Sequence, residues 1–339
     1  MKAVFAKDGF TQVSSVNDPI LNSGDILVEL KSCGICGSDI EKIFGKYGKT
    51  SMRLGHEPAG VVIAVGDDVK NLKVGDRVFT HHHVACLSCH LCKNGSETLC
   101  EKYSSSNLEP CGLSEKYVVP KWNVDNGGVL KLPDSMSFDE AALIEPLGCC
   151  IRAWNKITHN IDLVGIFGVG PTGLMHAMLA QDRGCKRMFC LDTSDFRLNF
   201  IKKFVSADTI NATDPDRLDK IHASCPMGLD LSLVATSSMQ ALSDAISATR
   251  KGGTVMMFGV PSKGAMLNID MSEFYSKEIT LLTSYAASDV DTKQALELIN
   301  SGFRVKDIIT HRFNLNDSND AFTKAKQGSD SMKIIIYHS

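Results

Sequence analysis

A glycine-rich hexapeptide near the middle of the chain constrains the fold more than any other feature. It follows the apolar run 163–167, precedes a helical pattern over 174–183, and reads Gly168-Val169-Gly170-Pro171-Thr172-Gly173. Strand, glycine turn and helix in this order are typical of a dinucleotide-binding βαβ unit, in which glycine permits a tight turn and the close approach of a pyrophosphate to a helix N-terminus. We therefore expect a parallel sheet here, with this turn against the phosphates of a dinucleotide.

The carboxylate that ends the next apolar run bears on the choice of cofactor. Asp192 lies nineteen residues beyond Gly173. A carboxylate at this point can accept from both hydroxyls of an adenosine ribose and repels a 2′-phosphate, which favours NAD over NADP. Arg197 leaves some room for NADP, and Asp192 could instead be the N-cap of a helix in Asp192-Thr193-Ser194. We expect NAD.

The spacing of short apolar runs changes along the chain and predicts two structural units. Up to about residue 150, short runs such as 26–30, 61–65 and 117–119 are separated by Gly, Asp and Pro, which predicts a compact, mostly antiparallel β unit. From about residue 160, runs at 163–167, 188–191, 231–234 and 255–258 alternate with helix-length segments, which predicts a doubly wound α/β unit. A helix over 291–301 and a strand over 333–337 form a tail that can return to the first unit.

Length and charge exclude several classes of function. A chain of 339 residues is long enough for two domains, and 36 Lys+Arg against 39 Asp+Glu give a net charge of −3 with the basic residues dispersed. We expect neither nucleic acid nor a membrane surface as a partner. The N-terminus lacks the unbroken apolar segment of a signal peptide, and the apolar stretch 163–180 contains the glycine turn, so we expect a cytoplasmic protein.

Four of the twelve cysteines are spaced as ligands of one ion. Cys86, Cys89, Cys92 and Cys100 form C-x2-C-x2-C-x7-C, and four thiolates this close can surround a tetrahedral Zn²⁺. The alternatives are an iron–sulfur cluster and free surface thiols. No proline follows the last cysteine and no second cluster pattern is present, so we expect a structural zinc lobe over about 86–100.

A second, sparser group also has the chemistry of a zinc site. Cys36, His56, Glu57 and Glu145 offer thiolate, imidazole and carboxylate ligands. Spacing alone is a weak argument, because a buried cysteine and a hydrogen-bonded histidine are commoner than ligands twenty residues apart. Cys33 and Cys36 also form the C-x-x-C of a redox dithiol, but no thioredoxin-like βαβ pattern surrounds them.

Three consecutive histidines, His81, His82 and His83, precede the cysteine lobe. Adjacent side chains on a strand point to opposite faces, so the three cannot converge on one ion. We interpret them as structural, with a role toward substrate or an interface as the alternative. We assign the Met and Phe positions of the α/β unit to its core.

These motifs together resemble, in type, order and separation, those of zinc-dependent medium-chain dehydrogenases, most closely the sorbitol and threonine dehydrogenase branch. Cys36-Gly-Ser-Asp, Gly55-His56-Glu57, the cysteine lobe, Ile144-Glu145-Pro146, the glycine turn and Thr310-His311-Arg312-Phe313 carry the resemblance, which covers essentially the whole chain. It implies an α/β protein with a GroES-like β-rich catalytic domain over 1–149 and 285–339, a Rossmann domain over 150–284, and an active site in a cleft between them.

The resemblance also implies roles for single residues. Cys36 and His56 match catalytic zinc ligands, Glu57 matches a carboxylate that ligates or swings onto the metal, and Glu145 falls where many alcohol dehydrogenases carry a second cysteine ligand. Ser38 matches the hydroxyl that accepts the substrate proton, and Asp39 a partner that orients His56.

Two positions depart from the family pattern. Glu41 stands where relatives often carry the histidine that ends the proton relay. The segment 283–287 lacks the arginine that polyol dehydrogenases place near it, which argues against specificity for polyols. If the segment is helical, Ser38 and Glu41 share a face, which leads to the hypothesis that Glu41 is the terminal base. The ordinary case for glutamate is a solvated side chain, and water would then end the relay.

The expected function is reversible, zinc-dependent hydride transfer between an alcohol, sugar or polyol and NAD, with two zinc ions per chain and a homodimer or homotetramer as the assembly. Two alternatives stay open. One is a zinc-independent quinone or enone reductase of the same superfamily, against which the retained ligand set argues. The other is a zinc-stabilised nucleotide-binding protein without turnover.

Overall fold

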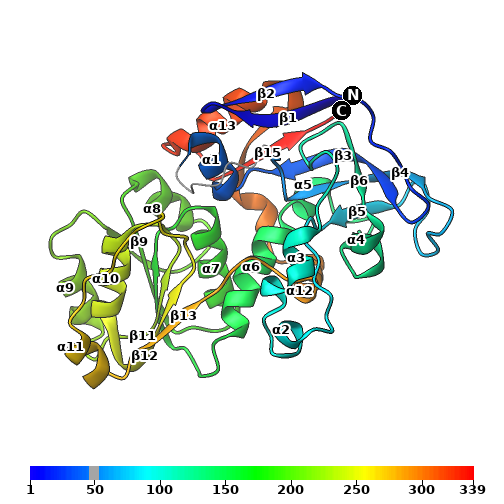
Figure 1. Cartoon of the computed structure of the whole chain (residues 1–339). Coiled ribbons are helices and arrows are strands. Elements are labelled where there is room, and N and C mark those ends of the chain that lie inside the picture. The colour runs from blue at the N-terminus through cyan, green and yellow to red at the C-terminus, as the bar shows by residue number, and fades with distance from the viewer. Residues whose placement is uncertain (46–52) are drawn as a thin grey trace. The chain divides into compact units, whose positions relative to one another are not determined.

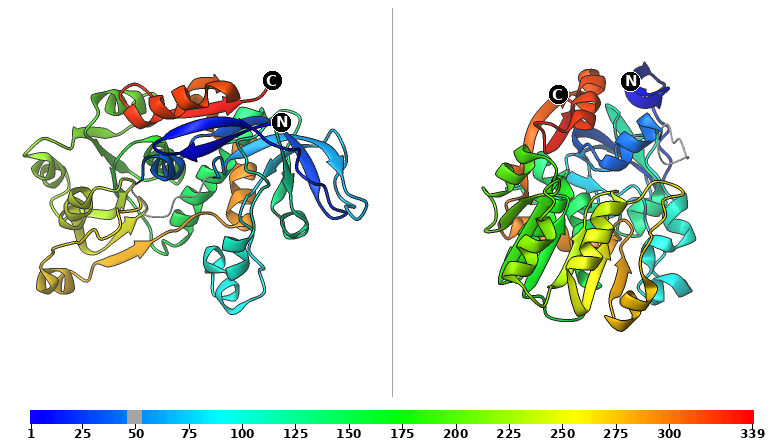
Figure 2. Two further views of the ribbon diagram at one scale, coloured as in Figure 1. Left: turned by 45° about the horizontal axis from the view of Figure 1, so that its top comes forward. Right: turned by 90° about the vertical axis from the view of Figure 1, so that its left-hand side faces the viewer.

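The computed structural model describes residues 1–45 and 53–339 and divides them into two compact units. The first comprises 1–149 and 286–339, and the second comprises 150–285. The sequence placed the second boundary after residue 284, one residue earlier. Both chain ends lie in the first unit, beside β1 and β15 (Figures 1 and 2).

The first unit is built on a seven-stranded sheet with the order β14-β15-β3-β4-β5-β7, in which β6 also pairs with β3. Its strands are β3 (Ile26–Gly34), β4 (Pro58–Val65), β5 (Arg77–Thr80), β6 (Lys116–Val119), β7 (Val129–Lys131), β14 (Ile309–Asn314) and β15 (Lys333–Tyr337), and β1 (Lys2–Lys7) and β2 (Phe10–Ser15) form a separate antiparallel pair. Most of its ladders are antiparallel, as the sequence predicted.

Strand β3 lies at the centre of this unit because its alternate residues are apolar. Ile26, Val28 and Leu30 are fully buried on one face, the period-2 pattern of a strand with one side in a core. The tail returns to the same strand, where β15 pairs antiparallel with β3 at Cys33 and Gly34. The tail is thereby fixed next to the Cys33–Cys36 loop.

Short helices fill the rest of the first unit. They are α1 (Gly37–Phe44), α2 (His90–Lys93), η1 (Glu97–Leu99), α3 (Glu101–Ser105), α4 (Lys121–Asp125), α5 (Phe138–Ala141), α12 (Asp289–Asn300), η2 (Val305–Ile308), η3 (Leu315–Asp317) and α13 (Ser318–Gln327), and α6 (Ile144–Asn155) continues past the boundary. A Ser137–Glu140 capping box starts α5, because each side chain satisfies a backbone N–H at the helix end.

The second unit is a six-stranded parallel sheet with the order β10-β9-β8-β11-β12-β13. Its elements are β8 (Leu163–Phe167), α7 (Pro171–Asp182), β9 (Arg187–Asp192), α8 (Asp195–Ile201), β10 (Asp208–Asn211), α9 (Arg217–Ser224), β11 (Leu229–Val234), α10 (Met239–Ala248), β12 (Thr249–Met257), α11 (Met271–Ser276) and β13 (Thr280–Thr283). Strand order reverses between β8 and β11, the point where such sheets bind ligands, and the glycine turn follows β8. The expected doubly wound sheet is confirmed.

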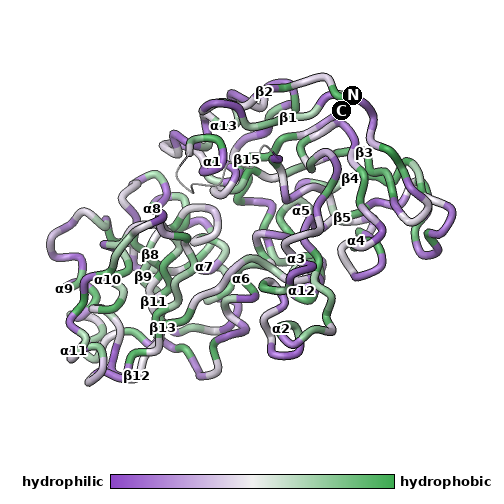
Figure 3. The backbone as a smooth tube through the Cα atoms, viewed as in Figure 1, coloured by the Kyte–Doolittle hydropathy of each residue, from purple (hydrophilic) through white to green (hydrophobic). Residues whose placement is uncertain are grey.

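Hydrophobic residues concentrate in the strands of both sheets, and hydrophilic residues in the connecting loops (Figure 3). The long apolar stretch 163–180 is divided between β8, the glycine turn and α7. Within residues 1–45 and 53–339, no helix combines the length and apolar character that crossing a membrane requires.

Candidate active site

The four lobe cysteines converge as their spacing predicted. Cys89 Sγ lies 3.5 Å from Cys92 Sγ, and Cys100 Sγ lies 3.5 Å from Cys86 Sγ, with 3.9 Å between Cys86 and Cys92. A tetrahedron of Zn–S bonds of about 2.3 Å has edges of about 3.8 Å, so four sulfurs at this separation fit one zinc ion. The lobe is attached to the first unit through Tyr103, whose hydroxyl donates to the Ala287 carbonyl at 2.8 Å.

The lobe thiols have very different affinities for protons. Hydrogen bonds from the Ser88 hydroxyl and from backbone N–H groups lower the pKa of Cys86 to about 5. Burial and hydrogen bonds with the neighbouring thiols raise the pKa of Cys92 to about 12. Crowded thiols cannot all ionise unless a cation joins them, so this chemistry also fits a metal ion.

A second group of potential ligands forms where two loops meet. Cys36 precedes α1, and His56 and Glu57 directly precede β4. One potential ligand atom from each residue lies within 4.8 Å of the other two, and His56 and Glu57 are buried. Cysteine, histidine and glutamate at this separation fit zinc with a position left open.

His56 is oriented by a buried carboxylate. Its Nδ1 lies 3.3 Å from Asp39 Oδ2, and Asp39 is fully buried on the first turns of α1. Burial disfavours charge on His56, but the charges of Asp39 and Cys36 raise its pKa well above the usual value. With Nδ1 facing Asp39, the other ring nitrogen of His56, Nε2, is the one that could bind a metal ion. Ser38 Oγ lies 3.5 Å from this Nε2.

Glu57 is held by a lysine from the returning tail. Lys333 Nζ lies 2.8 Å from Glu57 Oε1 and donates to the Ile35 carbonyl at 2.9 Å, with both side chains buried. Burial raises the pKa of Glu57, while the Lys333 ammonium works against this rise. The sequence analysis missed Lys333, because only the pairing of β15 with β3 places it here.

Glu145 stands apart from the three-residue group. It is buried on α6 and accepts a hydrogen bond from Cys149 Sγ at 3.3 Å. It does not belong to the group of ligand atoms that lie within 4.8 Å of one another. Burial lowers the pKa of Lys333, but the charges of Glu57 and Cys36 and, less strongly, of Glu145 raise it above its usual value.

Ser38 and Glu41 lie one turn apart on α1, so the expected helix is present. Glu41 is half-buried rather than solvated, and its Oε2 is buried without a hydrogen-bond partner among the described residues.

The three histidines have three different environments. His81 Nδ1 pairs with Asp289 Oδ1 at 3.0 Å, and His83 Nδ1 lies 2.6 Å from the Ser106 carbonyl oxygen. The His82 ring lies 5.2 Å from the His56 ring, and burial lowers the pKa of His82 well below its usual value. His82 is therefore a neutral imidazole beside the candidate metal site.

The position of His82 follows from strand register. Strands β4 and β5 pair Ala59 with Phe79, and continuing this register by three residues sets His56 opposite His82. Recognising that 58–65 and 77–80 form a pair would have revealed this neighbour from the sequence.

The glycine turn has the backbone that its sequence predicted. Gly168 has φ +90°, which favours glycine, and a Cβ on Gly173 would collide with the Gly168 carbonyl oxygen. A Cβ on Gly170 would meet only Arg197 within 4 Å among the described residues, so backbone here is open to a ligand. The turn precedes Pro171 and Thr172, which begin α7.

Asp192 is the last residue of β9, and its carboxylate accepts a hydrogen bond from the glycine turn. Its Oδ2 accepts from the Val169 N–H at 2.8 Å and its Oδ1 from the Ser194 N–H at 2.9 Å, and Arg197 lies 3.7 Å from Oδ2. The N-cap of α8 is Ser194, not Asp192, because the Ser194 side chain accepts from the helix. The alternative interpretation of Asp192 as the cap is therefore wrong.

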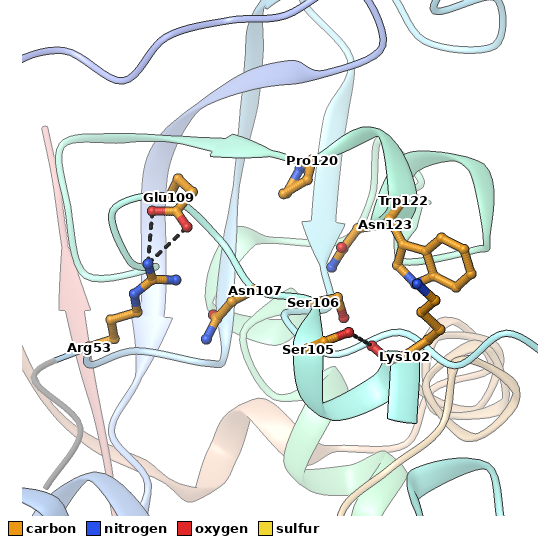
Figure 4. A pocket seen from close by; sticks show the side chains of 9 residues that line it. All are labelled: Arg53, Lys102, Ser105, Ser106, Asn107, Glu109, Pro120, Trp122 and Asn123. Carbon is orange, nitrogen blue, oxygen red and sulfur yellow. Dashed lines mark hydrogen bonds and ion pairs between the residues drawn. The ribbon is translucent and has the colours of Figure 1, made fainter. Parts of the chain in front are cut away.

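A surface cavity of about 280 Å³ lies elsewhere in the first unit (Figure 4). Arg53 pairs with Glu109 at one end, and Lys102 lies over the Trp122 ring at the other. Asn123 in its lining donates to the His81 and His82 carbonyls at 2.8 and 3.1 Å. The cavity lining thus holds the backbone that carries His82.

Comparison with known proteins gives a consistent result over the whole chain. The family model for alcohol dehydrogenase GroES-like domains matches residues 22–134, and that for zinc-binding dehydrogenases matches residues 171–301. A probable D-xylulose reductase A from Neosartorya fischeri is 32% identical, with 98% of this chain and 95% of that protein covered. This chain belongs to the zinc-dependent medium-chain dehydrogenase family.

Two further proteins of known name are similar to this dehydrogenase, one in sequence and one in structure. An L-threonine 3-dehydrogenase from Colwellia psychrerythraea is 29% identical, covering 94% of this chain and 93% of that protein. The structure of the alcohol dehydrogenase TADH from Thermus sp. ATN1 superimposes with a TM-score of 0.88 at 26% identity, covering 99% of both chains. The chain is a zinc-dependent oxidoreductase of alcohols or polyols.

Proposed function

We propose that this dehydrogenase transfers hydride reversibly between a secondary hydroxyl of a polyol or sugar and NAD, with one catalytic and one structural zinc ion per chain. The observation that carries the proposal is the convergence of Cys36, His56 and Glu57 within 4.8 Å, in a chain that also has the dinucleotide turn. A homodimer or homotetramer remains part of the proposal.

Charge supports a divalent cation at the Cys36 group. With His56 neutral as a metal ligand, the thiolate form of Cys36 and the carboxylates of Asp39, Glu57 and Glu145 would bring four negative charges to this region. Lys42 pairs with Asp39 and Lys333 with Glu57, which compensates two of them. A zinc ion would compensate the other two, and buried charges persist where they are paired or coordinate a metal. The candidate ligands are Cys36, His56 and one or both of Glu57 and Glu145.

A zinc ion held by these residues would supply a Lewis acid toward the substrate hydroxyl, and NAD held at the glycine turn would supply the hydride acceptor. The chain's own residues handle the proton. Ser38 Oγ, beside His56 Nε2, accepts the proton from the substrate, and Glu41 one turn later is the terminal base. His82, whose ring lies 5.2 Å from the His56 ring, is the neutral donor that would bind a further substrate hydroxyl. This role supports a polyol, although the segment 283–287 lacks the arginine of polyol dehydrogenases.

The preference for NAD rests on Asp192. Its two oxygens brace the turn, and each keeps a lone pair for a ribose hydroxyl. Asp192→Ala should narrow the preference for NAD over NADP, because it removes the repulsion of a 2′-phosphate.

The function is tested by mixing zinc-loaded protein with NAD⁺ or NADP⁺ and a panel of polyols, L-threonine and simple alcohols, and following absorbance of the reduced nicotinamide. We expect polyol-dependent turnover with kcat/KM higher for NAD⁺ than for NADP⁺. Nucleotide binding without turnover on any substrate would favour the nucleotide-binding protein. Enone reduction that survives Cys36→Ser would favour the zinc-independent reductase.

A further inference from the structure

A lysine on α1 contacts the carboxylate that orients His56. Lys42 lies three residues after Asp39 on α1, a spacing that places both side chains on one helix face. Its Nζ lies 3.0 Å from Asp39 Oδ1, and it also donates to the Arg53 carbonyl oxygen at 3.4 Å. The Lys42 side chain is 25% exposed, and the Asp39 side chain is 0% exposed.

The two oxygens of Asp39 therefore have separate partners. Oδ1 accepts from the Lys42 ammonium, while Oδ2 faces His56 Nδ1 at 3.3 Å and accepts from the Gly55 N–H at 3.4 Å. A carboxylate with one oxygen fixed by an ammonium has little freedom to rotate. The orientation of the imidazole plane thus depends on a lysine that does not touch it.

From this geometry we propose that Lys42 is a positioning residue for the catalytic zinc: its ammonium fixes Asp39, and Asp39 fixes the His56 ring with Nε2 toward the metal. The inference rests on the proposed function, because it assumes that His56 is a zinc ligand. It adds a third member, a cation, to the pair of carboxylate and histidine that commonly supports a bound zinc.

The burial of Asp39 distinguishes this contact from an ordinary surface ion pair. Exposed pairs at this helical spacing contribute little, because water screens both charges. Asp39 has no exposed surface, so removal of Lys42 leaves a buried carboxylate whose remaining partners, within residues 1–45 and 53–339, are His56 and the Gly55 N–H. Burial raises the pKa of Asp39, but the charges of His56 and Lys42 outweigh it and hold the pKa well below its usual value.

The test compares three substitutions in the full-length, zinc-loaded protein. Lys42→Met removes the charge at similar length, and Lys42→Arg keeps it. Lys121→Met is the matched control, since Lys121 forms an exposed helical pair with Asp125 in the same unit. Zinc release to a chelator is followed without substrate or cofactor, and kcat and the KM for NAD⁺ are measured separately.

We expect Lys42→Met to release one of the two zinc ions about tenfold faster and to lower kcat about tenfold, at the lower end of what loss of a supporting partner costs. The KM for NAD⁺ should not change. Lys42→Arg should restore both values, and Lys121→Met should match the original protein. If Lys42→Met fails to fold, Lys42→Gln, which keeps a hydrogen-bond donor without the charge, replaces it with the same expected direction.

Zinc release and kcat for Lys42→Met that match the original protein would overturn the inference, as would equal losses in Lys42→Arg and Lys42→Met. The zinc measurement separates this inference from the proposed function. A protein that lacks turnover but loses zinc faster in Lys42→Met would contradict the function and support the role of Lys42. Turnover of polyols by the original protein, together with unchanged zinc release in Lys42→Met, would support the function and contradict the role of Lys42.

Discussion

Gly34 is the residue on which the position of Glu57 most directly depends. A Cβ at this position would overlap Glu57 Oε2 and lie 2.8 Å from Lys333 Cε. Both atoms belong to a buried ion pair that cannot move outward into water. The end of β3 therefore accommodates Glu57 only while residue 34 has no side chain.

Gly34→Ala should displace Glu57 and Lys333, weaken zinc binding at the Cys36 group, and lower the free energy of unfolding by about 1–3 kcal/mol, the usual cost of overpacking. Gly37→Ala is the control, because a Cβ there meets nothing within 4 Å among the described residues. Zinc content and urea unfolding measure the two effects. Equal zinc content and stability in both variants would contradict this account of Gly34.

Glu41 provides a second test at this scale, through its buried and unpartnered Oε2. Glu41→Gln should slow alcohol oxidation at neutral pH by roughly 10- to 100-fold, since water can partly replace a general base, and should leave zinc content and NAD⁺ affinity unchanged. The measurement is kcat under conditions where a deuterium isotope effect shows that hydride transfer limits the rate. An unaltered kcat and pH profile would remove Glu41 from the relay.

The residues that the sequence identified are those whose partners lie in the same motif. The lobe cysteines are close in sequence, and His56 and Glu57 belong to one tripeptide. Lys333, in contrast, reaches Glu57 only through pairing of the chain ends, and His82 reaches His56 only through strand register. Contacts of this kind are set by tertiary structure, which periodicity in a single sequence does not encode.

At the scale of elements, α7 is a helix buried on every side. Residues 173–180 are all buried, including His176, whose ring packs edge-on against Phe258 at 4.4 Å. Neither ring nitrogen of His176 has a hydrogen-bond partner among the described residues, and burial lowers its pKa to about 3. The helix following the glycine turn therefore contains a histidine that must stay neutral.

This histidine makes the stability of the protein sensitive to acid. The folded-state pKa lies below the unfolded value of about 6.5, so the unfolded chain binds the proton more readily. The contribution of neutral His176 to the free energy of unfolding is complete above about pH 6.5. It is lost at about 1.4 kcal/mol per pH unit as the pH falls toward 3. When the pH falls from 7 to 5, the free energy of unfolding should therefore fall by about 2 kcal/mol more in the original protein than in His176→Leu, which has no histidine to protonate at this position.

Urea unfolding at the two pH values gives this difference. His159→Leu, at an exposed histidine of the same unit, is the control and should show the original dependence on pH. If the free energy of unfolding of His176→Leu and of the original protein changed equally with pH, protonation of His176 would not destabilise the folded protein, and this account of His176 would be wrong.

Elements were predictable where an apolar run coincides with a strand. Strands β8 and β15 have the expected ends, and β9 and β11 extend the expected runs by one or two residues. The expected run 255–258 extends one residue past the end of β12 at Met257. The strand itself begins earlier, at Thr249, which pairs with Leu229 of β11. The β1–β2 pair and α13 were not among the expected elements, and α13 packs against β2 in the structure.

At the scale of the whole molecule, the two units carry different parts of the chemistry. The unit of residues 1–149 and 286–339 contains both groups of potential zinc ligands, and the unit of residues 150–285 contains the dinucleotide turn and Asp192. The two metal groups differ in kind. Four sulfurs converge in the lobe, as in zinc sites that stabilise a fold, whereas the group at Cys36 brings together three potential ligands among the described residues, as in zinc sites that keep one position open.

The number of zinc ions per chain, measured together with turnover in the original protein, Cys36→Ser and Cys89→Ser, tests the central claim most directly. We predict two zinc ions in the original protein, one in folded but inactive Cys36→Ser, and loss of the other with marked destabilisation in Cys89→Ser, because closed sites contribute folding energy. Cys33→Ala, beside the same loop, should keep two zinc ions and turnover. One zinc ion or none in freshly purified protein, or turnover that survives Cys36→Ser, would contradict the account.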